Sequence, residues 1–325
     1  MIASSQLKGF LYILLADFLW GMSAALAKHL FNKQISPLDL SQIRMMLSFI
    51  ILAVYLAVIN PKLLRIGRKD IPYMIILGVF GLAAVQFCYY YTISETNVAT
   101  GVFLEYLAPI FILLYGLLTG KESATIVKVT ALLIATTGGL MIVKGTTGSG
   151  MAVTTAGLIS GLGSALAFAF YTLYGKYGLS KYSPWTLLMW GMGGGAAAWF
   201  FYAPPWVTLS SYGGSDWLFF IYIAVFATII PYGFFFKGLN HLPPLITGIT
   251  SNMEPVLAGI ISYLVLGEVL TIMQLFGCTF IIAAVIFLQF RNEQPSKKPP
   301  EYASNNRNKI SLPATGIQKQ ESTIN

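Results

Sequence analysis

Two stretches of the chain, LEYLAPIFILLYGLLTGKE at residues 104–122 and SNMEPVLAGIISYLVLGE at residues 251–268, follow one pattern. Each is largely apolar, and each places a proline thirteen residues before a glutamate: Pro109 with Glu122, and Pro255 with Glu268. Because the two prolines lie 146 residues apart, the pattern indicates that the second half of the chain is a copy of the first.

The remainder of the two halves aligns at an offset of 146 to 148 residues. The equivalent positions are Gly9 and Gly157, Trp20 and Phe168, Lys28 and Lys176, and the Ser-Pro pairs at 36–37 and 183–184. The offset changes by only two residues across the whole half, so the duplication extends over the full length of each copy.

Ten apolar runs occupy most of the chain, each close to the roughly 20 residues that cross a bilayer core. They are residues 9–30, 38–58, 71–91, 97–118, 124–143, 155–175, 184–203, 216–236, 243–265 and 270–290. The sequence therefore predicts an all-α membrane protein of ten transmembrane helices, five in each copy. Because five is an odd number, the second copy crosses the membrane in the opposite orientation, as inverted five-helix repeats do in many secondary transporters.

The composition also favours a lipid bilayer as the solvent. Of the 325 residues 56% are apolar and 10% are charged, which is too few polar residues to cover a water-soluble protein of this length. The net charge of +8 raises the question of nucleic acid, but the basic residues lie between the apolar runs instead of on one face. Cys88 and Cys278 lie inside apolar runs and imply neither a disulfide nor a metal site.

The basic residues predict the orientation. With both termini in the cytoplasm, only Lys28, Lys33 and Lys144 lie outside, in agreement with the positive-inside rule. The cytoplasmic segments then carry Lys8, Lys62, Arg65, Arg68, Lys69, Lys121, Lys128, Lys176, Lys181, Lys237 and Arg291. We expect a multi-pass protein of a bacterial inner or plasma membrane. Cleavage of the first run as a signal peptide, at Ala-Leu-Ala 25–27, is the alternative, but the run is too long for such a peptide.

These boundaries divide the chain into five parts. They are a cytoplasmic N-terminus (1–8), a first repeat (9–143), an external linker (144–154), an inverted second repeat (155–290) and a cytoplasmic tail (291–325). The tail is polar and is expected to be disordered. Its Leu-Pro-Ala-Thr-Gly sequence at 312–316 matches a sortase motif, but no apolar segment follows, so we interpret the match as chance.

With these features the chain resembles the EamA family of the drug/metabolite transporter superfamily, over nearly all of residues 8–290. The resemblance is carried by the Trp20-Gly21 pair, by Arg44 and by the two stretches quoted above. It implies a permease for small metabolites, often amino acids or amphipathic drugs, and frequently an exporter. It does not define the substrate, since members with these features carry unrelated cargo.

Four ionisable residues lie inside the predicted spans, where such groups are costly and mark candidate substrate or ion pathways: Asp17, Arg44, Glu105 and Glu254. Glu254 is expected near the midplane beside Pro255, which can interrupt the helix at the depth where transporters bind substrate. Arg44, bonded to backbone carbonyls or to Glu105, is expected to hold the outer half of the bundle together, with a role in the substrate or ion pathway as the alternative. Glu105 is otherwise a cavity acid, and Asp17 is left open between a structural and a site role.

Three acids against one arginine leave an excess of buried negative charge. A proton held by one of the acids, or a cationic or zwitterionic substrate, would relieve it. Our hypothesis is that Glu254 meets the amine of the substrate or a coupling proton. Glu105 and Glu254 stand where many relatives are expected to carry small or neutral residues, so this cavity is expected to be unusually acidic.

Aromatic and amide side chains extend the predicted site. Trp20, Tyr106 and Tyr171 lie deep enough to line a cavity, where aromatic faces attract organic cations. Asn252 lies two residues before Glu254, so the two side chains point apart on a regular helix and share a substrate only if Pro255 distorts the turn. A hydrogen bond between helices is the alternative for Asn252.

Other repeated residues are interpreted as structural. Glu122 and Glu268 end their spans and are expected to cap the next helix, and Pro109 and Pro255 shape theirs. Close helix contacts are expected at Gly157, Gly161, Gly191 and Gly193–Gly195.

Two other classes were weighed against a carrier. An enzyme would need a nucleophile with a base or a metal cluster, but the two histidines, His29 and His241, are predicted on opposite faces. A channel-like facilitator would give unsaturable flux. No cofactor is implied, and an ion or substrate gradient must supply the energy. Export is favoured, with import or exchange of another metabolite class as the alternative, and the oligomeric state is not predicted.

Overall fold

Every element that the structure describes is a helix. The computed structural model describes residues 4–32, 35–146, 154–266 and 269–290. The first copy contains α1 (Ser4–Asn32), α2 (Pro37–Ile59), η1 (Pro61–Leu64), η2 (Arg68–Asp70), α3 (Ile71–Ile76), η3 (Leu77–Ala83), α4 (Ala84–Glu95), α5 (Val98–Glu105), α6 (Ala108–Leu118) and α7 (Ile126–Thr146). The second contains α8 (Thr155–Gly178), α9 (Pro184–Trp199), α10 (Pro205–Ser210), α11 (Gly214–Ala224), η4 (Val225–Ile229), α12 (Ile230–His241), α13 (Pro244–Ser251), α14 (Glu254–Leu266) and α15 (Ile272–Phe290). Glu268 and the tail 291–325 lie outside the described residues.

The Ser-Pro pairs begin equivalent helices in the two copies. The Ser36 hydroxyl accepts a hydrogen bond from the Leu38 amide at the start of α2, and the Ser183 hydroxyl accepts one from the Thr186 amide at the start of α9. The following proline needs no amide partner in the first turn. A local signal in the sequence thus determines where both helices begin.

Both copies interrupt regular helix at the same places. The π-helical segments η3 and η4 begin 148 residues apart, between α3 and α4 and between α11 and α12. A second interruption separates α5 from α6 at residues 106–107, and its equivalent separates α13 from α14 at 252–253. Pro109 and Pro255 each occupy the first turn of the helix that follows. Helix breaks and π segments leave backbone groups free of their usual partners and are frequent at functional sites.

The packing of helices follows the duplication. Helix α1 packs on α12, and its equivalent α8 packs on α4, the equivalent of α12. Helix α1 also packs on α14, and α8 packs on α6, while α2 contacts its own equivalent α9 and α7 contacts its own equivalent α15. Each copy therefore presents the same faces to the other, which is the pattern of a pseudo-twofold axis.

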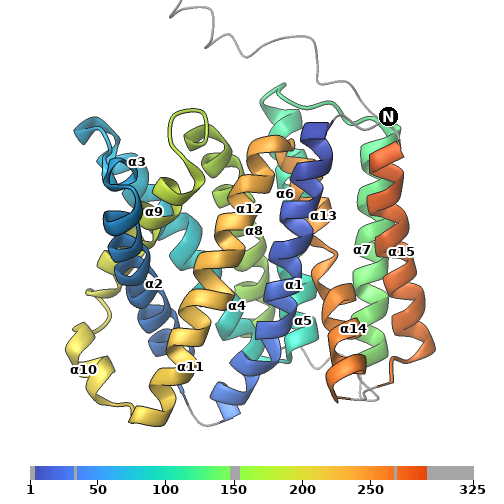
Figure 1. Ribbon diagram of the computed structural model, residues 1–325. Helices are drawn as coiled ribbons and strands as arrows, with labels where there is room; N and C mark the ends of the chain where they lie inside the picture. The colour runs from blue at the N-terminus through green and yellow to red at the C-terminus, as the bar shows by residue number, and fades with distance from the viewer. Residues whose placement is uncertain (1–3, 33–34, 147–153, 267–268, 291–325) are drawn as a thin grey trace, which may run out of the picture. The chain divides into compact units, whose positions relative to one another are not determined.

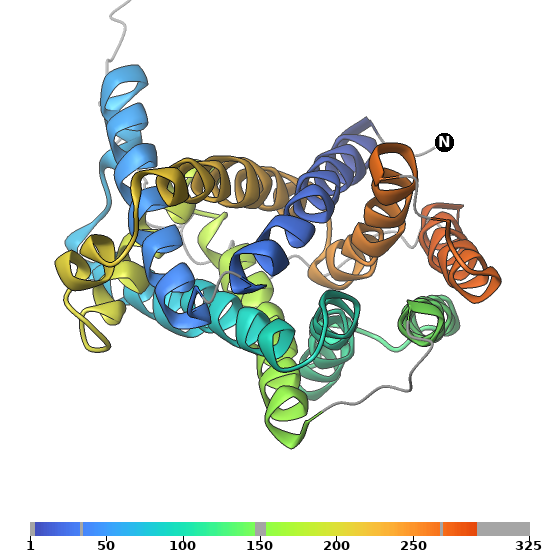
Figure 2. The same ribbon diagram turned by 90° about the horizontal axis from the view of Figure 1, so that it is seen from below.

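Helices α7 and α15 lie side by side at one edge of the unit formed by residues 1–290 (Figures 1 and 2). A Cβ atom built on Gly138 would lie 2.7 Å from the Gly277 carbonyl oxygen, and one on Gly277 would lie 2.6 Å from the Gly138 carbonyl oxygen. Only glycine at both positions permits this approach of the two backbones.

Seven helical stretches of the described chain are long and apolar enough to cross a bilayer: Pro37–Ile59, Arg68–Glu95, Val98–Leu118, Ile126–Gly145, Thr155–Gly178, Asp216–His241 and Ile272–Gln289. Three other expected spans are not among these seven. The side chains of α1 are described only as far as Ser23, α9 has only 16 residues, and the ninth apolar run is divided between α13 and α14. Leu133 and Ile159 are 62% and 67% exposed, as lipid-facing side chains are. The all-α membrane fold is confirmed, and the count of ten spans stays a prediction.

Candidate functional site

A central cavity of about 40 Å³ lies between the two copies, which is room for a few water molecules. It is lined by Trp20, Ser23, Arg44, Val85, Gln86, Tyr89, Tyr90, Glu105, Phe168, Ala227, Tyr232 and Glu254. Three of the four predicted ionisable residues, Arg44, Glu105 and Glu254, therefore lie around one cavity.

Arg44 is anchored by the second copy. Its Nε donates to the Thr228 hydroxyl at 2.5 Å, and a terminal nitrogen donates to the Ala227 carbonyl oxygen at 2.5 Å. The other terminal nitrogen donates to the Tyr90 hydroxyl, and the guanidinium lies 5.3 Å from the Tyr90 ring centroid and 5.8 Å from that of Tyr232. Ala227 and Thr228 belong to η4, so the π-helical turn supplies two of the three acceptors.

Glu105 ends α5 and accepts a hydrogen bond from the Ser164 hydroxyl of α8. Arg44 and Glu105 form no ion pair among the described residues; the guanidinium takes hydroxyl and carbonyl acceptors instead. Both side chains still line the same cavity.

Glu254 is the first residue of α14, at the interruption of the ninth span. The Tyr106 hydroxyl, at the equivalent interruption between α5 and α6, donates to Glu254 Oε2 at 2.5 Å. The helix N-terminus favours a negative charge at this position. Glu254 also lines a second cavity of about 400 Å³, so its carboxyl group stands at the border of two spaces.

Asn252 and Asp17 are buried near Glu254. The interruption turns Asn252 toward the same second cavity as Glu254, although the two would point apart on a regular helix. Its Oδ1 has no hydrogen-bond partner among the described residues, nor has either carboxyl oxygen of the fully buried Asp17. Asp17 lines neither cavity, but it belongs to α1, which packs on α14, the helix that begins at Glu254.

The predicted aromatic residues divide into two groups. Trp20 lines the central cavity and Tyr106 the second cavity, whereas Tyr171 lines neither. Tyr171 is fully buried, with its ring 5.1 Å from the rings of Phe168 and Phe235, and so belongs to the core. The depth of a residue within a span does not distinguish a side chain of the packed core from one that lines a cavity.

Sequence reasoning missed several residues of the central cavity. Gln86 and Tyr232 line it, and Thr228 binds Arg44. Gln86 is an amide within an apolar run and could have been found by the test applied to charged residues. Tyr232 and Thr228 carry no such signal, because aromatic and hydroxyl side chains are common in spans.

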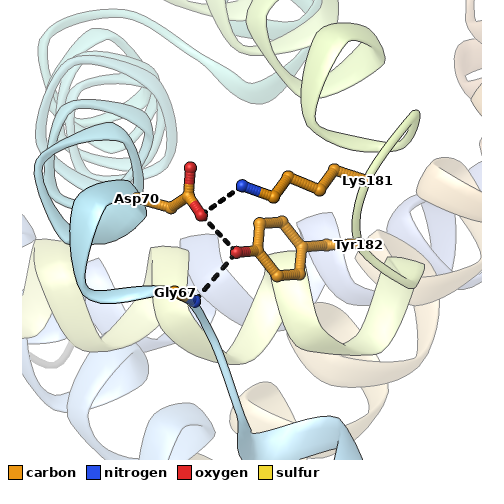
Figure 3. Close-up of polar contacts among 4 residues, drawn as sticks. All are labelled: Gly67, Asp70, Lys181 and Tyr182. Carbon is orange, nitrogen blue, oxygen red and sulfur yellow. Dashed lines mark hydrogen bonds and ion pairs between the residues drawn. The ribbon is translucent and has the colours of Figure 1, made fainter. Parts of the chain in front are cut away.

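Polar contacts join the two copies at one end of the bundle (Figure 3). Asp70 Oδ2 accepts from the Lys181 ammonium and from the Tyr182 hydroxyl, each at 2.5 Å, and the Gly67 amide donates to the Tyr182 oxygen at 3.0 Å. We call Asp70, Lys181 and Tyr182 the Asp70 cluster. It joins the segment after α2 to the segment after α8.

The hydrogen bond to Asp70 raises the pKa of the Lys181 ammonium. The contribution of this pair to the stability of the folded protein is complete at pH values below the pKa of lysine in the unfolded chain, about 10.4. It is lost only as the pH rises through the higher pKa that Lys181 has in the folded protein. The Asp70 cluster therefore keeps its charge pair throughout the neutral range.

A matching cluster lies at the other end of α2. Asp39 accepts from the Tyr202 hydroxyl at 3.2 Å and from the Tyr212 hydroxyl at 2.6 Å, which joins the start of α2 to the segments after α9 and α10. We call these residues the Asp39 cluster. Helix α2 has 23 residues, so roughly 35 Å of helix separates the two clusters.

Glu122 lies between α6 and α7 as predicted, but with a different contact. Its carboxylate pairs with Lys128 at 2.6 Å, and the Lys128 amide donates to the Thr125 hydroxyl. Thr125 thus provides the side-chain cap of α7.

The predicted close glycine contacts are present: a Cβ on Gly161 would lie 2.4 Å from Leu104, and one on Gly195 would lie 2.1 Å from Met45.

The sequence profile of the EamA-like transporter family matches residues 7–144 and, a second time, residues 155–290. The chain belongs to the EamA-like transporter family. The two matches confirm the duplication and make the protein a multi-pass membrane transporter.

Named relatives of this EamA-like protein are also transporters. It is 28% identical over 297 residues to the uncharacterized inner membrane transporter YicL of Salmonella typhimurium, covering 90% of this chain and 99% of YicL. It is 26% identical over 266 residues to the threonine/homoserine exporter RhtA of Escherichia coli, covering 80% and 84% of the two chains. A protein of known crystal structure superposes with a TM-score of 0.70 at 17% identity, over 90% of this chain and all of that one, which shows the fold alone.

Proposed function

We propose that this protein is a secondary transporter of small organic amines or amino acids, working by alternating access between ten helices arranged as two inverted repeats. The pseudo-twofold packing pattern supports the inversion, because five spans per copy place the axis in the membrane plane. In this arrangement α5–α6 and α13–α14 are interrupted spans that meet at the midplane.

The observation that carries the proposal is the position of Glu254 at a helix break, bordering two cavities and bonded to Tyr106 of the other copy. An ionised carboxylate away from water is costly unless it is paired. Glu254 therefore meets the ammonium group of a substrate in one state and a coupling proton in another. Asp17, which is buried and has no hydrogen-bond partner in the described part of the chain, is a second candidate for holding a proton.

The Asp70 and Asp39 clusters suit the alternation. Each joins the two copies at one end of the bundle, and opening a path to that end separates the loops that the cluster connects. We propose that breaking the Asp70 cluster accompanies opening at its end and that breaking the Asp39 cluster accompanies opening at the other.

We further propose that the Asp70 end faces the cytoplasm of a bacterial inner or plasma membrane. The start of α1 and the end of α15 lie at the same end as α3, opposite α10 (Figure 1). Basic residues concentrate there, including Lys62, Arg65, Arg68 and Lys181, as the positive-inside rule requires. Export is the favoured direction, since the relative RhtA is named as an exporter.

The first experiment is transport by Glu254→Gln in proteoliposomes with an imposed pH gradient, using radiolabelled threonine and homoserine. We expect saturable flux of at least one probe in the wild type and its loss in Glu254→Gln at equal expression. Glu95→Gln, at an exposed carboxylate, is the matched control. Normal flux by Glu254→Gln at every pH would exclude the role of Glu254, and unsaturable wild-type flux would indicate a channel-like facilitator.

A further inference from the structure

The second cavity has the size and lining of a ligand site. Its volume of about 400 Å³ is ten times that of the central cavity and falls within the range typical of small-molecule pockets. It lies among α5, α7, α14 and α15, and most of its wall is apolar, with Val102, Phe103, Ala135, Ile142 and Ile281 as examples. The central cavity has room for only a few water molecules, so an organic molecule larger than these needs the second cavity.

The polar side chains of this cavity are Tyr106, Asn252 and Glu254 from the two helix interruptions, with Thr136 from α7 and Gln274 from α15. Tyr106 and Glu254 come from the two interruptions and are joined by their hydrogen bond. Asn252 is 3% exposed, and its Oδ1 is a buried acceptor without a partner among the described residues. A buried acceptor left unpaired costs free energy that a donor from a ligand would recover.

The two features together select a class of ligand. A carboxylate and an amide oxygen that line the same cavity can both accept hydrogen bonds from an ammonium group, and the mostly apolar remainder of the wall suits an aryl or alkyl body. A lipid acyl chain would fill the apolar part but would leave the Asn252 oxygen unpaired. A small hydrophilic amine would pair with the oxygens but leave most of the cavity empty.

We propose that the cavity among α5, α7, α14 and α15 binds amphipathic primary amines, with the ammonium group on Asn252 and Glu254 and the apolar body against α7 and α15. This inference rests on the proposed transport of amines and adds the substrate class and the place of its apolar part. It gives the α7–α15 pair a role in specificity, since α7 contributes Ala135 and Ile142 to the wall and α15 contributes Ile281.

The test is equilibrium binding of tritiated 4-phenylbutylamine to the full-length protein in phosphatidylcholine nanodiscs. Ala135→Trp fills the cavity, and Asn252→Ala removes the unpaired acceptor. Leu133→Trp is the matched control, because Leu133 lies on the same helix and is 62% exposed. We expect each cavity variant to weaken binding about tenfold or more, the loss that follows from excluding a phenyl group or a charged hydrogen bond. The control should bind as the wild type does.

Further measurements separate the possible failures. Because Ala135→Trp can disturb folding, each variant is also checked for monodispersity and for its midpoint of thermal unfolding. If Ala135→Trp and Asn252→Ala both bind 4-phenylbutylamine as the wild type does, the inference is wrong while the role of Glu254 stands. A phospholipid that native mass spectrometry finds in the wild type but not in Ala135→Trp, with amine affinity unchanged, would make the cavity a lipid site and also overturn the inference. Normal flux by Glu254→Gln would instead contradict the proposed function.

Discussion

At the scale of single residues, Arg44 shows how a buried cation is held without a carboxylate. Its three donors point at a hydroxyl of each copy and at a carbonyl released by a π-helical turn. The planar fork of the guanidinium matches this arrangement, whereas the compact ammonium of lysine cannot reach three separated acceptors. Arg44 therefore connects the copies and leaves the cavity acids available for other partners.

We predict that Arg44→Lys lowers the stability of the folded protein by about 2 kcal/mol, the order of one or two lost charged hydrogen bonds. Thermal unfolding in detergent, followed by circular dichroism, measures the change. Arg65→Lys, at an exposed loop position, is the control and should unfold as the wild type does. An equal midpoint for both variants would show that the fork geometry does not matter.

At the scale of elements, the sequence predicted more of the helices than of their interruptions. Long apolar runs and the Ser-Pro starts located most spans, because length and local capping determine them. For the interruption at 252–253, the sequence predicts only that Pro255 can interrupt its helix. The interruption at 106–107 and the segments η3 and η4 are not predicted, because π-helical turns depend on tertiary packing and leave no clear sequence signal.

The same limit applies to the candidate site. Charge within a span located Arg44, Glu105 and Glu254 at one cavity. It did not separate them from Asp17, which lines neither cavity, because side-chain direction depends on helix rotation and tertiary packing. Whether these residues carry transport stays a prediction.

Close packing of helix backbones leads to a prediction at the same scale. A Cβ on Gly78 of η3 would lie 2.3 Å from the Gly191 carbonyl oxygen and 2.6 Å from the Gly195 amide nitrogen, both in α9. Since backbone atoms cannot move aside, we expect Gly78→Ala to destabilise the protein by about 2 kcal/mol or more. Gly163→Ala, whose Cβ would meet only Cys88 at 3.4 Å, should be neutral or slightly stabilising. Thermal unfolding of both variants checks the contrast.

At the scale of the whole molecule, the Asp70 and Asp39 clusters oppose each other across the length of α2. Exposed ion pairs and hydrogen bonds are weak, so each cluster can bias a conformational equilibrium without locking it. A transporter needs this property, because a strongly stabilised end would stop the cycle.

We predict that Asp70→Asn raises the population open at the Asp70 end severalfold at most. Spin labels at Lys69 and Ser180, read by electron–electron double resonance, should report a larger fraction of long distances. Asp39→Asn should not increase that fraction. High salt should reproduce part of the Asp70→Asn effect, because it screens the Lys181 charge. Unchanged distances in Asp70→Asn would remove this cluster from the gating mechanism.

The place of Glu254 as a common wall of two chambers has a thermodynamic consequence. A ligand that binds the Glu254 carboxyl group from one cavity changes the affinity of the other cavity for its ligand by some factor. Thermodynamic linkage requires the second ligand to change the affinity for the first by the same factor. A single shared acid is thus sufficient to make two occupancies interdependent, without any signal passing through the rest of the bundle.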